Sequence, residues 1–185
     1  MTTTTQPLTL EEFLQLPETK PASEYIEGQI FQKPMPKSRH SRLQGRLMRA
    51  INEVVEDIKY AYAFPELRCT VGGRSIVPDV AVLLWHNIRF NKDGEPIDNV
   101  STAPDWTIEI LSPGQSPNLV TGNILHCLEY GCQLGWLIDP KDRSILGYFP
   151  HYQPVLYKES DRIPFLGNIP LNLTTEQVFS WLKMA

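Results

Sequence analysis

The segment from residue 105 to residue 140 constrains the fold most, because it carries a strand, a helix and a second strand in succession. Residues 105–111 (DWTIEIL) read as one strand, and residues 134–140 (LGWLIDP) read as a buried second one. Between them the apolar spacing predicts a helix over residues 118–130, which Gly131 ends. A strand, a helix and a strand in this order form a right-handed crossover between parallel strands. The segment therefore predicts an α/β architecture.

The flanking sequence adds shorter strands and further helices. Strands are predicted at residues 25–31, 67–71, 75–77, 80–85, 144–149 and 154–157. Helices are predicted at residues 10–16 and 40–58 and near the C-terminus, and Thr9 and Thr174 each begin a capping box. Residues 86–104 are polar and turn-rich, which indicates a surface loop. We expect a single domain over residues 1–185 of the α/β (α+β) class, with a mixed sheet flanked by helices and a short N-terminal tail.

Composition excludes several classes of protein. The chain has 185 residues, of which 42% are hydrophobic, and this is ordinary globular composition. It has no apolar run long enough to cross a membrane and does not begin like a secretory signal, so we expect no membrane contact and a cytoplasmic location. Its net charge of −4 argues against binding nucleic acid by bulk charge alone.

The predicted helix over residues 40–58 carries a line of arginines beside its apolar stripe. Arg39, Arg42, Arg46 and Arg49 follow one another at helical spacing, so they share one face. One interpretation is a solvated flank, because Glu53 lies four residues after Arg49 and can pair with it. The other is a phosphate-binding stripe beside a cleft.

Two acidic residues occur within predicted apolar strands. Asp79 opens the apolar run that ends at Trp85, and Glu109 lies between Ile108 and Ile110. A carboxylate in such a place is costly unless it is paired or bound to a cation. Two carboxylates on adjacent strands could share one hard cation such as Mg²⁺, which prefers oxygen ligands. The alternative is that each one only caps a strand or forms a salt bridge.

Several motifs in order resemble a known family over nearly the whole chain. They are residues 10–14 (LEEFL), 23–29 (SEYIEGQ), His40, 77–82 (VPDVAV), 108–113 (IEILSP) and 136–140 (WLIDP). This set resembles the Uma-type (Uma-two) restriction endonucleases, which are abundant in cyanobacteria and belong to the PD-(D/E)XK nuclease superfamily. The resemblance implies a restriction-endonuclease-like fold and Mg²⁺-dependent hydrolysis of DNA.

The resemblance also assigns residues to a site. It implies that Asp79, Glu109 and the main-chain carbonyl of Ile110 bind the metal, which would activate a water and stabilise charge on the phosphate. A second Pro-Asp pair contains Asp105, but Asp105 and Glu109 lie four residues apart on one strand. That is about 13 Å at the strand rise of roughly 3.3 Å per residue, too far for one metal. In the family His40 lines the site, and Glu24 matches an acidic position to which we assign an accessory role.

One element of the family pattern is missing. The superfamily places a lysine two residues after the glutamate, where this chain has Leu111, and the Uma-type branch places it on the next helix, where this chain has Asn123. Asparagine can bind a water or a phosphate but carries no charge. The expectation is slow or absent cleavage that Asn123→Lys increases, and the alternative function is a catalytically impaired relative that binds nucleic acid or a protein partner.

Three further readings of the sequence remain open. His126, Cys127 and Cys132 could suggest zinc, but without a fourth ligand buried cysteines are the better interpretation. A homodimer is conceivable because the hairpin near the C-terminus is rich in aromatic residues, namely Tyr148, Phe149, Tyr152 and Tyr157. A purely structural domain without a ligand is the third function class.

Overall fold

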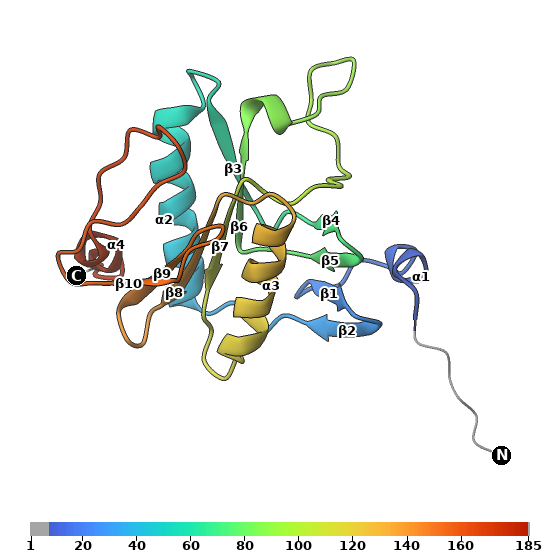
Figure 1. The fold of residues 1–185 in the computed structure, drawn as a ribbon, viewed down its shortest axis with the longest axis horizontal. Helices are drawn as coiled ribbons and strands as arrows, with labels where there is room; N and C mark the ends of the chain where they lie inside the picture. The colour runs from blue at the N-terminus through green and yellow to red at the C-terminus, as the bar shows by residue number, and fades with distance from the viewer. Residues whose placement is uncertain (1–7, 185) are drawn as a thin grey trace.

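The computed structural model describes residues 8–184, which form two β-sheets and four α-helices (Figure 1). The larger sheet has six strands in the order β10-β9-β8-β7-β6-β3. Its strands are β3 (Ala61–Pro65), β6 (Val80–Leu84), β7 (Trp106–Ile110), β8 (Leu134–Asp139), β9 (Ser144–Tyr148) and β10 (Val155–Lys158). The neighbours β7 and β8 run parallel and are joined by α3 (Pro117–Glu129), which confirms the crossover predicted from the sequence.

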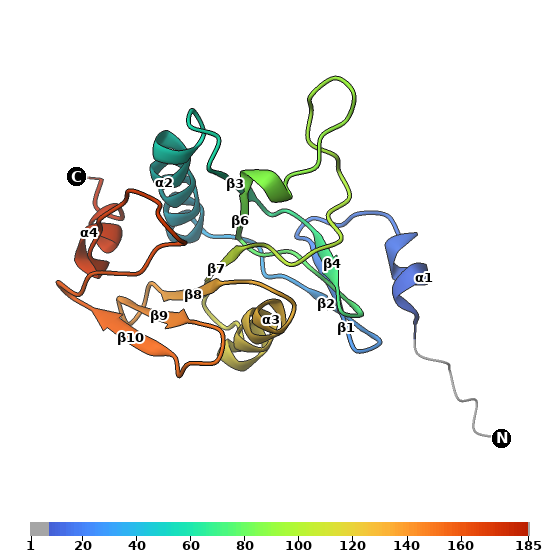
Figure 2. The same ribbon diagram turned by 45° about the horizontal axis from the view of Figure 1, so that its top comes forward.

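The smaller sheet has four antiparallel strands in the order β2-β1-β5-β4. Its strands are β1 (Ser23–Ile26), β2 (Gln29–Gln32), β4 (Cys69–Val71) and β5 (Arg74–Ile76). Figure 2 shows this sheet on the α3 side of the larger one, with α1 (Leu10–Leu14) at its outer end. The larger sheet is the mixed sheet that the sequence predicted; the smaller antiparallel sheet is separate from it, and residues 77–79 connect β5 directly to β6.

Helices cover both faces of the larger sheet. On one face α2 (Ser38–Val55) and α4 (Thr175–Ser180) pack over a core that includes Trp106 and Trp136, whose rings meet edge to face with centroids 4.6 Å apart. On the other face α3 packs through Val120 and Ile124 against Leu137 of β8. Burial of these apolar side chains is the main source of the stability of the fold.

The structure departs from the sequence expectations in two places. Helix α2 spans residues 38–55 rather than 40–58, and Ile58 is exposed. Strand β3 was not predicted at all. Both differences have one cause: the chain turns back at residues 56–60, and the Asn52 side chain exchanges two hydrogen bonds with the backbone of Ala63, which fixes β3 beside the helix.

Other local predictions are confirmed or fall outside the described residues. Thr9 and Thr174 each begin a capping box, and residues 86–104 contain only a 3₁₀ turn (Trp85–Asn87) at their start and residues of two isolated bridges. The predicted N-terminal tail lies in residues 1–7, outside the described part of the chain. Among residues 8–184, none of the helices is long and apolar enough to cross a membrane.

Candidate active site

The register of two strands brings Asp79 and Glu109 together. Strands β6 and β7 are antiparallel with Val80 opposite Ile108, so the next pair outward is Asp79 and Glu109. Opposite residues point to the same face of a sheet, with Cβ atoms about 4.5–5.5 Å apart. Both side chains therefore lie on the face toward α3 and the smaller sheet, and they are only 3% and 2% exposed.

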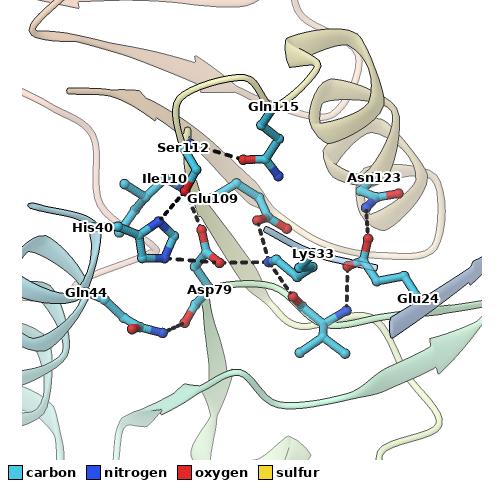
Figure 3. A network of polar contacts seen from close by, with 11 residues as sticks. Glu24, Lys33, His40, Gln44, Asp79, Glu109, Ile110, Ser112, Gln115 and Asn123 are labelled. Carbon is cyan, nitrogen blue, oxygen red and sulfur yellow. Dashed lines mark hydrogen bonds and ion pairs between the residues drawn. The ribbon is translucent and has the colours of Figure 1, made fainter. Parts of the chain in front are cut away.

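The ammonium group of Lys33 lies between these two carboxylates (Figure 3). Its Nζ atom is 2.7 Å from Oδ1 of Asp79 and 3.2 Å from Oε2 of Glu109, and it also donates to the carbonyl of Val77 at 2.7 Å. Lys33 directly follows β2, so the position of the smaller sheet places this ammonium group beside the ends of β6 and β7 in the larger sheet. The Lys33 side chain is 13% exposed.

Burial and neighbouring charges shift the pKa values of the three groups in different directions. Burial alone would raise the pKa of Asp79, but the charge of Lys33 and the contact with His40 outweigh it and hold that pKa at about 2. Burial raises the pKa of Glu109 well above its usual value, and Lys33 only partly opposes this. Burial disfavours the charged form of Lys33, but Glu109, Asp79 and Glu24 together raise its pKa above the usual value.

The proline of the Pro-Asp motif has a structural role at this site. Pro78 lies two residues before the start of β6 at Val80, and proline has no N–H to donate to a β-ladder. The N–H of Ile110 instead donates to Oδ2 of Asp79 at 2.7 Å. The paired part of β6 therefore begins at Val80, and the hydrogen bond from Ile110 fixes the Asp79 carboxylate at the end of β7.

The donor set of this site fits a hard divalent cation. Asp79 and Glu109 offer carboxylate oxygens, Ile110 offers a carbonyl oxygen, and such oxygens are the ligands that Mg²⁺ prefers. Two buried carboxylates also need a positive charge between them, and the structure places the ammonium of Lys33 there. The residues that could hold a metal are therefore Asp79, Glu109 and Ile110.

His40 lies on the first turn of α2 and borders the site. Its Nε2 atom is 3.5 Å from Oδ1 of Asp79, and its Nδ1 atom is 3.3 Å from the hydroxyl of Ser112. One turn further along α2, the amide of Gln44 donates to the carbonyl of Asp79 at 2.7 Å. Helix α2 thus fixes both the backbone and the side chain of Asp79.

Glu24 and Asn123 pair with each other beside the carboxylate pair. The carboxylate of Glu24 on β1 accepts hydrogen bonds from Nδ2 of Asn123 on α3, at 3.0 Å, and from the N–H of Val77, at 2.9 Å (Figure 3). Both side chains are buried. The structure therefore places Asn123 next to Glu24, with no hydrogen bond from its side chain to Asp79 or Glu109.

The second Pro-Asp carboxylate belongs to the other end of β7. Asp105 is buried and accepts hydrogen bonds from the N–H of Leu84 and from the Asn87 side chain. This position agrees with the spacing argument that Asp79, not Asp105, is the partner of Glu109. Asp105 anchors the end of β6 and the turn that follows it.

The four arginines of the predicted stripe on α2 have different partners in the structure. Arg42 donates to the carbonyl of Trp181, and the Arg46 guanidinium lies over the Trp181 ring, so these two residues attach α2 to the C-terminal segment instead of flanking the site. Arg49 pairs with Glu53 at 2.6 Å, as the spacing predicted. Arg39 is exposed and lines a groove next to His40, so it alone of the four faces the site.

The residues considered for zinc and for a dimer have other surroundings. Cys127 and Cys132 are buried in an apolar cluster with Cys69, and Nε2 of His126 lies 2.9 Å from the carbonyl of Val71. Tyr148 is buried against α3, and Phe149 and Tyr157 pack against the main core, whereas Tyr152 is exposed. The hairpin therefore offers less aromatic surface than the sequence suggested.

A cleft of about 390 Å³ reaches the site from solvent, and a groove of about 570 Å³ adjoins it across His40 and Ser112. Cationic side chains line these two hollows, namely Lys20, Lys33, Lys37, Arg39 and Lys141. Acidic residues line them as well, and one of these, Glu18, is paired with Arg68. The lining therefore carries cationic side chains beside an acidic site, although the chain as a whole has a net charge of −4.

Lys33 is the residue that sequence reasoning missed, and the expectation of a site without a basic side chain is wrong. Lys33 lies 46 residues before Asp79 and 76 before Glu109, so no local spacing connects it with them. Its one local signal is position: it follows the strand pair that carries Glu24 and precedes Pro34, where the strand must end.

The six-stranded mixed sheet, its flanking helices and the carboxylate pair at the ends of the interior strands β6 and β7 define a restriction-endonuclease-like protein. The chain belongs to the Uma2 family, described as "putative restriction endonuclease", whose model matches residues 10–176. It is similar to a crystal structure described as a putative nuclease belonging to DUF820 from Anabaena variabilis ATCC 29413. The TM-score is 0.94 at 49% identity, covering 96% of this chain and 100% of that one. No curated protein matches the chain.

Proposed function

We propose that the protein is a divalent-metal-dependent endonuclease that hydrolyses phosphodiester bonds of DNA. The observation that carries this proposal is the meeting of Asp79 and Glu109 at one cation position, 2.7 and 3.2 Å from the same Nζ atom. Family membership and the nuclease description of the similar crystal structure support DNA as the substrate.

The residues of the site divide the chemical work. Asp79, Glu109 and the Ile110 carbonyl would hold Mg²⁺, which when bound supplies an acidified water and positive charge at the phosphate. Lys33 would contribute a further positive charge close to the reacting phosphate, since its side chain borders the carboxylate pair. His40, between Asp79 and Ser112, would orient the Asp79 carboxylate or contact a phosphate oxygen.

A cleavage assay with matched variants tests the proposal. Wild-type protein with Mg²⁺ or Mn²⁺ should nick supercoiled plasmid, and chelator should stop the reaction. Asp79→Asn should lower the rate by about 10²–10³ or more, since it removes a ligand charge. Asp105→Asn is the matched control: it alters the other buried Pro-Asp carboxylate, at the far end of β7, and should retain cleavage below its melting temperature.

Two results would count against this function. Cleavage that persists equally in Asp79→Asn and in chelator would place the activity elsewhere. Salt-sensitive DNA binding without any cleavage would favour the alternative function, a nuclease-fold protein that only binds nucleic acid.

A further inference from the structure

The ammonium of Lys33 occupies the place that a metal shared by Asp79 and Glu109 would need. Its three hydrogen-bond acceptors are an oxygen of each carboxylate and the Val77 carbonyl. A divalent cation held by these two carboxylates would compete with the ammonium for their oxygens, because metal–oxygen distances of about 2.0–2.1 Å for Mg²⁺ are shorter than the Nζ–oxygen distances of 2.7 and 3.2 Å.

Electrostatic repulsion also opposes simultaneous occupation of the site by the Lys33 ammonium and a divalent metal ion. A unit charge and a divalent ion only a few ångströms apart in a buried site repel each other by several kcal/mol even at an effective dielectric constant of about 20. The site is buried, with Asp79 and Glu109 at most 3% exposed, so solvent screens little of this repulsion.

We propose that Lys33 is a built-in counter-ion of the carboxylate pair, which a divalent metal displaces when it binds. The inference rests on the proposed function, since it concerns the same metal site. In the metal-free protein Lys33 neutralises the two carboxylates and holds them in place. The apparent metal affinity is then reduced by the fraction of molecules in which the ammonium has not left.

A further carboxylate, that of Glu24, lies near Lys33 and could accept its ammonium group after displacement. Glu24 on the neighbouring strand β1 is buried and acts on Lys33 as an attractive charge. Its carboxylate is fixed by the N–H of Val77 and by Asn123, and Val77 is also the residue whose carbonyl accepts from Lys33. On displacement, Lys33 keeps its bond to the Val77 carbonyl and turns from Glu109 toward Glu24. Its four-carbon chain has the freedom to make this turn.

Mn²⁺ binding to the full chain, measured by calorimetry or by the electron paramagnetic resonance of free Mn²⁺, tests the exchange. Lys33→Met removes the competing ammonium but keeps most of the side-chain volume. It should bind Mn²⁺ roughly tenfold or more tightly than wild type, because no counter-ion must be displaced. Lys20→Met is the matched control, since it removes an exposed lysine from the same cleft, and it should change the affinity by less than about threefold.

A second measurement uses the unmodified protein and does not depend on how well Lys33→Met folds. In ¹H–¹³C spectra of lysine-labelled protein, the Lys33 Cε resonance should move when Mg²⁺ is added, while that of Lys20 should not. The same titration of Asp79→Asn should leave Lys33 unmoved, because the metal position is lost.

The outcomes separate the exchange from the proposed function. If wild type binds metal but the Lys33 resonance stays fixed, or if Lys33→Met binds no more tightly than Lys20→Met, the exchange is overturned and the nuclease proposal stands. Binding by Lys33→Met alone would also overturn the exchange, since Lys33 would then block the metal permanently. No binding by either protein would remove the metal site and both proposals with it.

Discussion

The Nζ atom of Lys33 lies 2.7 Å from the carboxylate of Asp79, although the two residues are 46 positions apart and adjoin strands of different sheets. Lys33 directly follows β2, an outer strand of the smaller sheet, and Asp79 directly precedes β6 of the larger one. The candidate site is therefore complete only when the two sheets keep their relative position. Residues 77–79, which join β5 to β6, fix that position from within the site.

This contact leads to a prediction about where the basic side chain can act. Lys33→Met should lower the cleavage rate by about 10²–10³, the usual cost of a lost electrostatic contact at a reacting centre. Asn123→Lys should not raise the rate of the wild-type chain, because position 123 faces Glu24 and a lysine there would pair with that carboxylate. The expectation from the sequence alone was a rise, and the position of Lys33 changes it.

Single-turnover plasmid nicking by the two single variants and by the double variant, at saturating Mg²⁺, checks this prediction. Partial recovery in Lys33→Met/Asn123→Lys would show that an ammonium can reach the site from α3 once the site of Lys33 is free. A tenfold increase by Asn123→Lys in the wild-type background would contradict the prediction, since it would mean that Lys33 does not fill the role.

The sequence predicted the parts of the site that depend on local patterns. Asp79 and Glu109 were found because acidic residues within apolar strands are unusual, and the strand–helix–strand pattern set their elements. Lys33 could not be found this way, since a lysine at the end of a short strand is ordinary on a surface. Its burial depends on how one sheet packs beside the other, and no periodicity encodes that packing.

The same limit explains the errors in the fold. Strand β3 places Ala61 and Ala63 in the core, and alanine has little tendency to form strands, so its inward-facing positions carry a weak signal although Tyr62 and Phe64 on the other face favour a strand. Arg42 and Arg46 were assigned to a helix face correctly, but which partner that face meets was decided by the distant Trp181. Local patterns predict elements and faces, whereas long-range packing decides their partners.

Glu109 gives a prediction about pH and stability. Burial raises the pKa of Glu109 in the folded protein, so the folded state holds its proton more tightly than the unfolded state does. The contribution of Glu109 to stability is therefore largest at acidic pH and is lost as the pH rises above 4.5, the ordinary pKa of a glutamate. Glu109→Gln, which mimics the protonated form, should remove this loss and melt a few degrees above wild type at pH 7 without metal.

Thermal melts of both proteins between pH 4.5 and 8 in chelator provide the measurement. About 1 kcal/mol corresponds to roughly 2–4 °C for a chain of this size. Glu53→Gln, on the exposed face of α2, is the control for loss of a charge and should follow the wild-type pH profile. A lower melting temperature for Glu109→Gln at pH 7 would show instead that the ion pair with Lys33 outweighs the cost of burial.

The divided arginine stripe predicts which residue contacts phosphate. Arg39→Ala should weaken DNA binding and reduce the slope of log affinity against log salt by about one unit, as expected for one lost phosphate contact. Arg42→Ala should leave that slope unchanged and instead lower the melting temperature, because its guanidinium holds the carbonyl of Trp181. Binding titrations with Asp79→Asn as the background, which prevents cleavage, give the slopes; equal slope changes for both would contradict the assignment.

The contact between α3 and the larger sheet depends on the absence of a side chain at Gly135. A Cβ atom there would lie 2.3 Å from Cγ2 of Ile124, which is fully buried, so helix and strand would have to separate. Overpacking of this kind costs about 1–3 kcal/mol, and Gly135→Ala should melt several degrees lower than wild type. Gly122→Ala is the matched control, because a Cβ at this α3 position meets nothing within 4 Å, and alanine favours the helix by about 1 kcal/mol. Calorimetric melts should therefore move in opposite directions for the two variants, and a wild-type melting temperature for Gly135→Ala would show that α3 does not pack this closely on β8.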